Sequence, residues 1–277
     1  MPELPEVETM LRGIRTACEG HVLQSLQFLP CTRKPITINP DRNAFARLSG
    51  HQLDRLERLG KRLLMHFDCD LTMIVEPRMT GLMLVADPPT TEHLRIQMKF
   101  RTSQADCTTV LFWDRRGLGT VSLLVPAELQ ALRDRLGPDA LTITTDSLRA
   151  ALRRTRRAVK PALLDQQLVA GVGNLYASEI LHLAGISPRR RCHRLLRREV
   201  VQIADATREI LSIAVRYEGS TLNDGTYRNA LNQDGGYQNH HRVYNREGQL
   251  CPTCQQTVIK RIVQTQRSTF FCPGCQH

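Results

Sequence analysis

The chain has 277 residues, of which 41% are hydrophobic, and its formal net charge at pH 7 is +11. This length allows two domains with a small additional module, and the composition excludes a largely disordered chain. No run of about 18 apolar residues occurs and residues 1–6 lack the pattern of a secretory signal, so we expect a cytoplasmic protein without membrane contact rather than a membrane or secreted one.

The predicted N-terminal half consists of one helix followed by strands. A helix over residues 3–18 is indicated by apolar residues spaced three and four apart, namely Leu4, Val7, Leu11, Ile14 and Cys18. From about residue 22 to 124 apolar and polar residues alternate instead, most clearly over residues 94–100. The other strand candidates are residues 63–67, 71–75, 82–85, 108–113 and 120–124. Several short strands joined by turns predict a β-sandwich that carries the N-terminal helix.

After the turn at residues 136–139 the pattern becomes helical. The predicted helices are residues 147–157, 161–169, 175–184 and 194–217. A loop rich in Gly, Asn and Asp follows over residues 218–247, and loops of that length are usually functional or mobile. The expected fold class is therefore α+β, with a β-sandwich domain (1–135), an all-helical domain that includes this loop (136–246) and a C-terminal metal-binding module (247–277).

The positive charge is concentrated in the helical part of the chain. Residues 146–217 contain 14 Lys and Arg against 6 Asp and Glu, an excess of 8 charges out of the net 11. This concentration favours a surface that binds phosphates, with a solvated helix surface as the alternative. Five cysteines are scattered singly, which is typical of buried side chains in a reducing compartment. They are Cys18, Cys31, Cys69, Cys107 and Cys192.

The remaining four cysteines form the most specific pattern in the sequence. Cys251 and Cys254 are separated by two residues, as are Cys272 and Cys275, and 17 residues lie between the two pairs. Two such pairs supply four thiolates for one tetrahedral, structural zinc ion, and the intervening segment is long enough for a β-hairpin. A four-cysteine site leaves no open position for water, so we expect it to fold a module and not to catalyse a reaction. A redox-active cysteine pair is the alternative.

Residues 169–176 form a glycine-containing turn between two helical segments. Gly171 and Gly173 let backbone amides approach a phosphate at a helix N-terminus, where Asn174 is placed to cap the helix and to donate from its side chain. A tight turn between packed helices explains the same glycines equally well.

The N-terminus is a candidate nucleophile. Pro2 is small enough for routine removal of Met1, which exposes a secondary amine. An α-amino group has a pKa of about 7.7–8.0, and the positive end of a helix disfavours its protonation further. Such an amine attacking a sugar C1′ forms an iminium, which acidifies the 2′ hydrogens and permits elimination of the 3′ phosphate. A capped acidic first turn is the alternative interpretation of Pro2, Glu3 and Glu6.

Residues 1–8, Met-Pro-Glu-Leu-Pro-Glu-Val-Glu, resemble the start of the formamidopyrimidine-DNA glycosylase and endonuclease VIII family. The resemblance continues in order through residues 136–138, 160–161 and 171–179, and through the cysteine module with Gln266 and Arg267. It covers essentially the whole chain. It implies a β-sandwich, a helix-two-turn-helix domain ending in a zinc finger, and DNA held between the two domains. The implied partner is damaged double-stranded DNA, bound by a monomer near the nucleoid.

The resemblance also implies roles for individual residues. Pro2 would be the Schiff-base nucleophile, Glu3 the acid that assists opening of the deoxyribose ring, and Glu6 an organising residue. Lys61 and Arg267 would contact phosphates at the reaction site. The implied DNA-binding residues are His93, Lys160 and Asn174, together with the three residues that fill the space of the extruded base, Met79, Arg116 and Leu118.

Two departures from the family pattern bear on the substrate. Leu118 stands where glycosylases of this type usually have Phe, and Glu76-Pro77-Arg78 replaces the usual His-Leu-Gly. A carboxylate at residue 76 would repel phosphate if it faced the groove, unless Arg78 compensates. The N-terminal motif favours the formamidopyrimidine branch, and hence 8-oxoguanine and formamidopyrimidines removed by β,δ-elimination. The alternatives are an oxidised-pyrimidine glycosylase, a relative that binds damage without cutting, and a zinc-ribbon RNA-binding protein.

Overall fold

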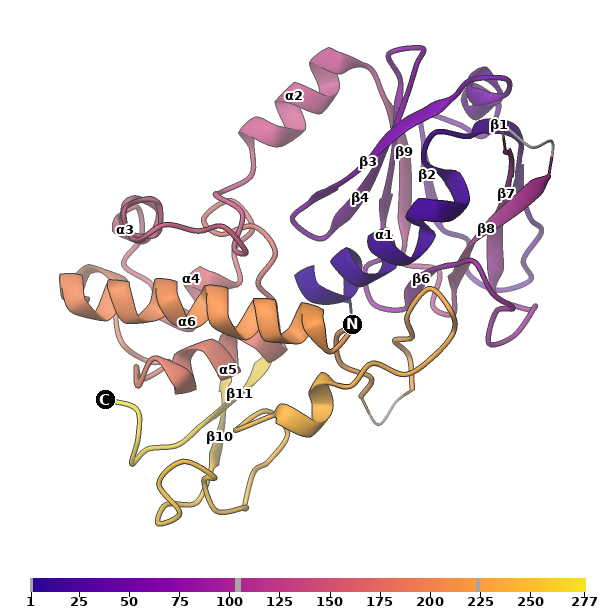
Figure 1. Ribbon diagram of the computed structural model, residues 1–277. Coiled ribbons are helices and arrows are strands. Elements are labelled where there is room, and N and C mark those ends of the chain that lie inside the picture. Colours follow the sequence, from indigo (N-terminus) through magenta and orange to yellow (C-terminus); the bar gives the residue numbers. More distant parts are fainter. Residues whose placement is uncertain (1, 103–105, 223–224) are drawn as a thin grey trace. The chain divides into compact units, whose positions relative to one another are not determined.

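The computed structural model describes residues 2–102, 106–222 and 225–277 (Figure 1). The chain divides into two compact units. The first comprises Met1–Asp134 and Tyr217–Gln238, and the second comprises Arg135–Arg216 and Asn239–His277. Met1 itself, whose removal the sequence predicts, lies outside the described residues.

The first unit is the β-sandwich predicted from the alternating pattern. One sheet has the order β1-β7-β8-β6 and is antiparallel. Its strands are β1 (Val22–Phe28), β6 (Gly81–Leu84), β7 (Leu94–Arg101) and β8 (Cys107–Asp114). The other sheet has the order β2-β9-β5-β4-β3, in which β2 and β9 run parallel. Its strands are β2 (Thr37–Asn39), β3 (Leu53–Leu59), β4 (Arg62–Phe67), β5 (Thr72–Glu76) and β9 (Thr120–Leu124).

Helix α1 (Leu4–Cys18) packs against strands of both sheets, β3, β4, β6 and β8 (Figure 1). Of the residues at its three- and four-residue spacings, Val7, Leu11, Ile14 and Cys18 belong to the core that fills the sandwich, and Leu4 is also buried, so the predicted helix is confirmed. The unit also contains a 3-10 helix (Asn43–Leu48) and helix α2 (Pro126–Asp134). The sequence analysis did not predict α2, none of whose residues is buried.

Residues Tyr217–Gln238 return to the first unit, although the sequence assigned them to the helical domain. Tyr227 and Ala230 are buried in the sandwich core, and the Ala230 carbonyl accepts a hydrogen bond from Val85 N–H at 2.9 Å. A Cβ added at Gly13 would lie 2.3 Å from Ala230 Cβ, so α1 needs glycine where this segment crosses it. These contacts join residues far apart in the sequence, and periodicity within the segment could not reveal them.

The second unit contains four helices at the predicted places, followed by a hairpin. The helices are α3 (Thr145–Arg153), α4 (Val159–Leu163), α5 (Asn174–Leu183) and α6 (Arg197–Arg216), with a 3-10 turn at Cys192–Arg194. Two of the helices are shorter than predicted, since α3 ends at residue 153 and not 157, and α4 ends at residue 163 and not 169, where the Gln166 side chain bonds to loop backbone instead. Helix α5 packs against α4, α6 and strand β11. The hairpin pairs β10 (Lys260–Gln264) with β11 (Arg267–Phe271), which lie between the two cysteine pairs. A further 3-10 turn spans Tyr237–His240.

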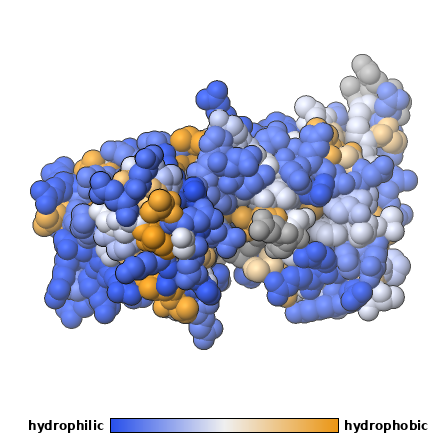
Figure 2. Space-filling view, turned by 90° about the horizontal axis from the view of Figure 1, so that it is seen from below, coloured by the Kyte–Doolittle hydropathy of each residue, from blue (hydrophilic) through white to orange (hydrophobic). Residues whose placement is uncertain are grey.

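The exposed side chains are mainly polar. Figure 2 shows a face dominated by hydrophilic residues, with hydrophobic ones in separate small groups. No helix in the described ranges is long and apolar enough to cross a membrane.

Candidate functional site

The N-terminal end of α1 is built around two buried carboxylates. Glu3 precedes the first helical residue and is 3% exposed, and Glu6 in the first turn is 2% exposed. Their side chains and backbone N–H groups form a reciprocal capping box, in which Glu3 N–H donates to Glu6 Oε2 at 2.8 Å. Pro2 therefore lies at the positive end of the helix dipole, beside two acidic side chains held in fixed positions.

Glu6 also holds a segment that is remote in sequence. Its Oε1 accepts a hydrogen bond from Ser220 N–H at 2.9 Å. Gly219 has φ +78°, and a Cβ there would lie 2.8 Å from Glu6 Oε1, so only glycine allows this approach. Glu6 thus joins the N-terminal residues to the start of the 220–237 loop. The sequence predicted an organising role for Glu6 but not this partner.

The 220–237 loop is closed by its own hydrogen bonds. Thr221 Oγ1 donates to the Tyr227 carbonyl at 2.8 Å and accepts from Gly235 N–H at 2.9 Å. Thr221 N–H donates to Gln238 Oε1 at 3.0 Å. Residues 223 and 224 lie outside the described ranges. The rest of the loop is therefore tied back to Thr221, immediately after the Glu6 contact.

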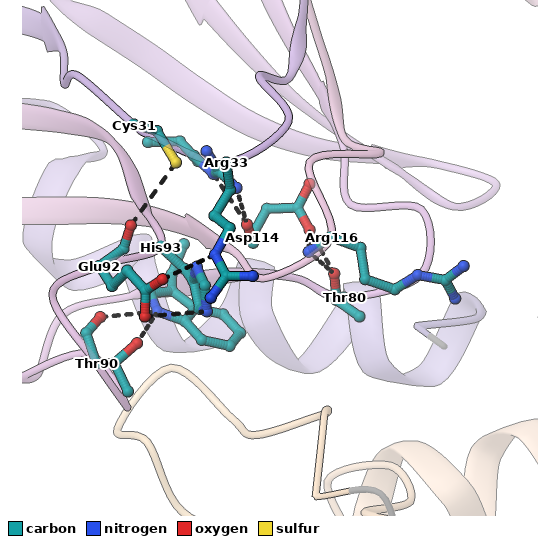
Figure 3. Close-up of polar contacts among 10 residues, drawn as sticks. Cys31, Arg33, Thr80, Thr90, Glu92, His93, Asp114 and Arg116 are labelled. Atoms are coloured by element: carbon teal, nitrogen blue, oxygen red, sulfur yellow. Dashed lines mark hydrogen bonds and ion pairs between the residues drawn. The ribbon is translucent and has the colours of Figure 1, made fainter.

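Met79, Arg116 and Leu118 project from two loops of the sandwich. Met79 follows β5, and Arg116 and Leu118 lie between β8 and β9. Met79 and Leu118 are half-buried, whereas Arg116 is exposed. Figure 3 shows the Arg116 side chain extending away from Asp114 and Thr80. Thr80 and Asp114 hydrogen-bond to each other, so the structure brings the three predicted residues together through their neighbours.

The departure at residues 76–78 is locally compensated. Glu76 forms ion pairs with Arg62 at 3.1 Å and with Arg78 at 3.3 Å. Two guanidinium groups therefore balance the charge of the Glu76 carboxylate.

His93 lies against the sandwich and Lys61 lies in a turn. The His93 residue is 9% exposed, and its ring packs edge-on against Trp113 at 5.5 Å (Figure 3). Its Nε2 lies 3.8 Å from Glu92 Oε2. Lys61 is half-buried in the turn that joins β3 to β4.

Lys160 is the central polar residue of the second unit. Lys160 is 1% exposed. Its Nζ donates to Asn174 Oδ1 at 2.8 Å, to the Ser268 carbonyl at 3.0 Å and to Thr269 Oγ1 at 2.9 Å. An ammonium has three N–H donors, so protein acceptors take all of them. Lys160 thereby fixes the Asn174 amide and the start of β11, where Arg267 is exposed.

Asn174 occupies a different position from the one predicted. It is the first residue of α5, and Gly173 is the N-cap. Because its Oδ1 accepts from Lys160, the amide NH2 is directed elsewhere and is the group available for donation. The expectation that the Asn174 side chain caps the helix was wrong, since the buried ammonium of Lys160 is a stronger partner than a backbone amide.

The four cysteines of the C-terminal module form one cluster. Their Sγ atoms all lie within 4.8 Å of one another, with Cys251–Cys275 and Cys254–Cys272 separations of 3.8 Å. Tetrahedral zinc with Zn–S bonds of about 2.3 Å places its sulfurs roughly 3.8 Å apart, so the cluster fits such an ion. Backbone N–H groups of Gln256 and Thr257 lower the pKa of the Cys254 thiol, whereas burial raises the pKa of the Cys272 and Cys275 thiols. The fit to a metal ion therefore rests on the spacing of the four sulfurs.

Glu179 is a residue whose role the sequence did not predict. It is fully buried in α5, and its carboxylate accepts from the N–H groups of Arg242, Val243 and Tyr244 at 2.8–3.0 Å. Burial raises the pKa of this carboxyl group, and the three N–H donors oppose that shift. Glu179 therefore anchors the segment leading into the cysteine module. Its only sequence signal was its place at the end of the 171–179 motif.

Comparison with known proteins agrees with this arrangement. The family model described as the formamidopyrimidine-DNA glycosylase N-terminal domain matches residues 1–121, and that of the formamidopyrimidine-DNA glycosylase H2TH domain matches residues 136–226. A formamidopyrimidine-DNA glycosylase of Chloroflexus aurantiacus is 38% identical, over 100% of this chain and 98% of its own. The chain belongs to the formamidopyrimidine-DNA glycosylase family. A Thiobacillus denitrificans member is also 38% identical over the full length of both chains.

Solved structures of formamidopyrimidine-DNA glycosylases have the same fold. The MutM (Fpg) protein of Thermus thermophilus is 34% identical and superposes with a TM-score of 0.84 over 99% of this chain and 98% of its own. Lactococcus lactis Fpg in complex with DNA containing an abasic site is 30% identical and superposes with a TM-score of 0.85 over 99% of both chains. A mutant of that enzyme in complex with DNA containing Fapy-dG is 31% identical and superposes with a TM-score of 0.87 over the full length of both chains. The predicted α+β fold is confirmed.

Proposed function

We propose that this glycosylase removes oxidised purines, namely 8-oxoguanine and formamidopyrimidines, from duplex DNA and then cleaves the strand. The observation that supports this most strongly is the position of Pro2 at the positive end of α1, beside the buried Glu3 and Glu6. The relatives' names and the DNA lesions in their complexes point to the same class of substrate.

The nucleophile is the secondary amine of Pro2 after removal of Met1. The free amine attacks C1′ of the damaged nucleotide while Glu3 donates a proton to the ring oxygen, so the sugar ring opens. The C1′–base bond breaks, the base leaves with its bonding electron pair and a proton, and an iminium links Pro2 to C1′. The helix end helps because it disfavours the protonated amine.

Strand cleavage follows from the iminium. The iminium acidifies the 2′ hydrogens, so loss of a 2′ proton expels the 3′ phosphate, and a second elimination expels the 5′ phosphate. Hydrolysis then releases the sugar fragment and regenerates the amine. Cleavage therefore leaves a phosphate at both ends of the gap.

DNA binding is assigned to phosphate contacts. Lys61 lies in the sandwich unit, and Asn174 and Arg267 lie in the helical unit together with the basic segment 146–217. A buried nucleotide must be extruded before reaction, which costs a few kcal/mol, and charge-assisted contacts on both sides of it offset that cost. The cysteine cluster binds one structural zinc ion, whose role is to hold the hairpin that carries Arg267.

The 220–237 loop is assigned to the extruded base. This assignment is supported by the Glu6 contact that fixes the start of the loop and by the hydrogen bonds that join Thr221 to Tyr227 and Gly235. Oxidised purines are the proposed substrate because the N-terminal motif is that of the formamidopyrimidine branch. Oxidised pyrimidines are the alternative class.

A panel of lesions tests this proposal. Duplexes containing 8-oxoguanine, a formamidopyrimidine, thymine glycol, an abasic site or no lesion are incubated with enzyme, and released bases and strand ends are analysed. We expect purine lesions to be excised fastest, with phosphate at both ends of the gap. Faster excision of thymine glycol would assign the enzyme to pyrimidines, and binding without cleavage of any duplex would make it a damage-recognition protein.

Replacing Leu118 with Phe should accelerate excision of a paired purine lesion. An aromatic ring beside the orphaned base adds stacking worth roughly 1–3 kcal/mol, which an aliphatic side chain does not supply. An abasic site needs no base extrusion, so its cleavage should change little. Single-turnover rates on the two substrates measure this difference. Equal effects on both, or no effect on either, would place Leu118 in sandwich packing alone.

Replacing Arg267 with Ala should weaken DNA binding most at low salt. Removal of one cationic group from the phosphate backbone lowers the slope of log affinity against log salt by about 0.9. Arg261 on the neighbouring strand provides a matched control, since it is also exposed but pairs with Glu247 at 3.9 Å. Titrations at several salt concentrations should give a smaller slope for Arg267→Ala than for Arg261→Ala. An unchanged slope and affinity would remove Arg267 from the interface.

A further inference from the structure

The three side chains assigned to the space of the extruded base come from two loops. Met79 lies between β5 and β6, and Arg116 and Leu118 lie between β8 and β9. Side chains that enter a stacked duplex together must keep a fixed spacing, because disorder among them adds to the cost of insertion. Some feature of the fold must therefore join the two loops.

The carboxylate of Asp114 is at the centre of that junction. Asp114 is 0% exposed, and three donors contact its two oxygens. Thr80 Oγ1 and Arg116 N–H donate to Oδ1, the latter at 3.2 Å (Figure 3). Gly119 N–H donates to Oδ2 at 2.7 Å. Arg116 N–H also reaches Thr80 Oγ1 at 3.0 Å. One carboxylate thus holds the residue after Met79 and the backbone on both sides of Leu118.

The Asp114 backbone is itself fixed by β7. Nε and Nη2 of Arg95 donate to the Asp114 carbonyl at 2.9 and 2.7 Å, and Asp114 N–H donates to the His93 carbonyl at 2.9 Å. The Arg95 residue is 2% exposed. A buried guanidinium that donates two hydrogen bonds to one carbonyl holds that carbonyl in a defined position. The junction therefore rests on the rigid sheet and not on another loop.

The loop after Asp114 has little freedom of its own. A Cβ at Gly119 would lie 2.8 Å from Phe112 Cζ and 3.1 Å from Asp114 Oδ2. Gly117 has φ +60°, and a Cβ there would lie 1.9 Å from the Lys34 carbonyl oxygen. Glycine on each side of Leu118 thus lets the backbone pack directly against the sandwich.

We propose that Asp114 is a positioning residue that couples the two loops, so that Met79, Arg116 and Leu118 enter the duplex as one preorganised unit. This inference rests on the proposed function. The three groups that contact the carboxylate are all donors, so acceptor oxygens are required there. Thr80 joins this carboxylate to the loop that carries Met79. This coupling affects the extrusion of a paired base and the recognition of the base opposite it. It does not affect the reaction at C1′.

Three variants separate this role from general stability. Asp114→Asn places an NH2 group where an oxygen faces N–H donors, Thr80→Val removes the hydroxyl link while keeping a branched side chain, and Thr80→Ser keeps the hydroxyl. Thr72→Val is the matched control, because Thr72 is also buried in the sandwich and hydrogen-bonds to His66 at 3.0 Å instead. Active enzyme is counted in each preparation by borohydride trapping on abasic DNA.

Excision of 8-oxoguanine opposite cytosine and cleavage of an abasic site are then compared under single turnover. For Thr80→Val and Asp114→Asn we expect excision to fall by roughly tenfold, the factor given by about 1.4 kcal/mol, while abasic-site cleavage changes less than about twofold. The ratio of excision opposite cytosine to excision opposite adenine should move towards one. Thr80→Ser and Thr72→Val should keep wild-type ratios.

The outcomes distinguish the two levels of inference. Wild-type enzyme that cleaves neither substrate would contradict the proposed function itself. Active wild-type enzyme with equal losses on both substrates in Thr80→Val, or an unchanged opposite-base ratio, would overturn the role of Asp114 and leave the proposed function intact. Should Asp114→Asn fail to fold, Thr80→Val and Thr80→Ser decide the question.

Discussion

Acetylation of the N-terminal amine should abolish borohydride trapping and strand cleavage while leaving DNA binding intact. Acetylation delocalises the nitrogen lone pair into the new amide carbonyl, so the nitrogen no longer attacks C1′ and the iminium cannot form. Neither the borohydride-trapped adduct nor the cleaved strand is then produced. We expect the cleavage rate to fall by at least about a hundredfold, equivalent to roughly 2.7 kcal/mol of barrier. Gel-based trapping and binding assays on the same abasic duplex measure both properties.

The modification must be confined to the chain end. An α-amine reacts before lysine near neutral pH because its pKa is about two units lower. Mass spectrometry of digested protein should show acetylation of Pro2 and none of Lys61 or Lys160. Undiminished trapping by protein modified in this way would exclude Pro2 as the nucleophile.

Replacing Cys272 with Ser should remove the metal and most of the DNA affinity together. The cysteine module has only a small apolar core, formed by Val243, Ile259, Phe270 and the buried Cys251 and Cys272. A core of that size does not fold a module without a metal. Because four cysteine thiolates bind one zinc ion, we expect about one zinc per chain in the wild type. The zinc content of the variant should be much lower.

Cys192→Ser is the matched control for this decrease. Cys192 is also buried in the second unit, at 4% exposure, but it lies outside the cluster. Zinc content by atomic emission and affinity by fluorescence anisotropy should be retained in this control. Full zinc content and full affinity in Cys272→Ser would contradict both the metal site and its role in presenting Arg267.

Elements with a strong local pattern were predictable from the sequence. Helix α1 and strand β7 each bury one face, so their apolar residues recur at spacings of three to four and of two. The cysteine hairpin followed from ligand spacing alone. Strands β1 and β3 were not among the predicted ones, because charged and polar residues interrupt their alternation and much of each strand is only half-buried.

The sequence named candidate site residues but not the contacts among them. The resemblance named Lys160 as a DNA-binding residue, but it could not show that Lys160 is buried against Asn174, 14 positions away, and against Ser268 and Thr269 of β11, more than a hundred positions away. The contact between Glu6 and Ser220 spans 214 positions. Pairings of this kind are set by tertiary structure, and a single sequence contains no periodic signal for them.

Mapping the covalent adduct tests the central claim most directly. Enzyme is incubated with a duplex containing 8-oxoguanine opposite cytosine in the presence of borohydride, and the digested complex is sequenced by tandem mass spectrometry. The proposed mechanism predicts a reduced sugar adduct on the N-terminal peptide, attached to the nitrogen of Pro2, with Met1 absent. An adduct on a lysine side chain such as Lys61, or no adduct on DNA that the enzyme cleaves, would contradict it.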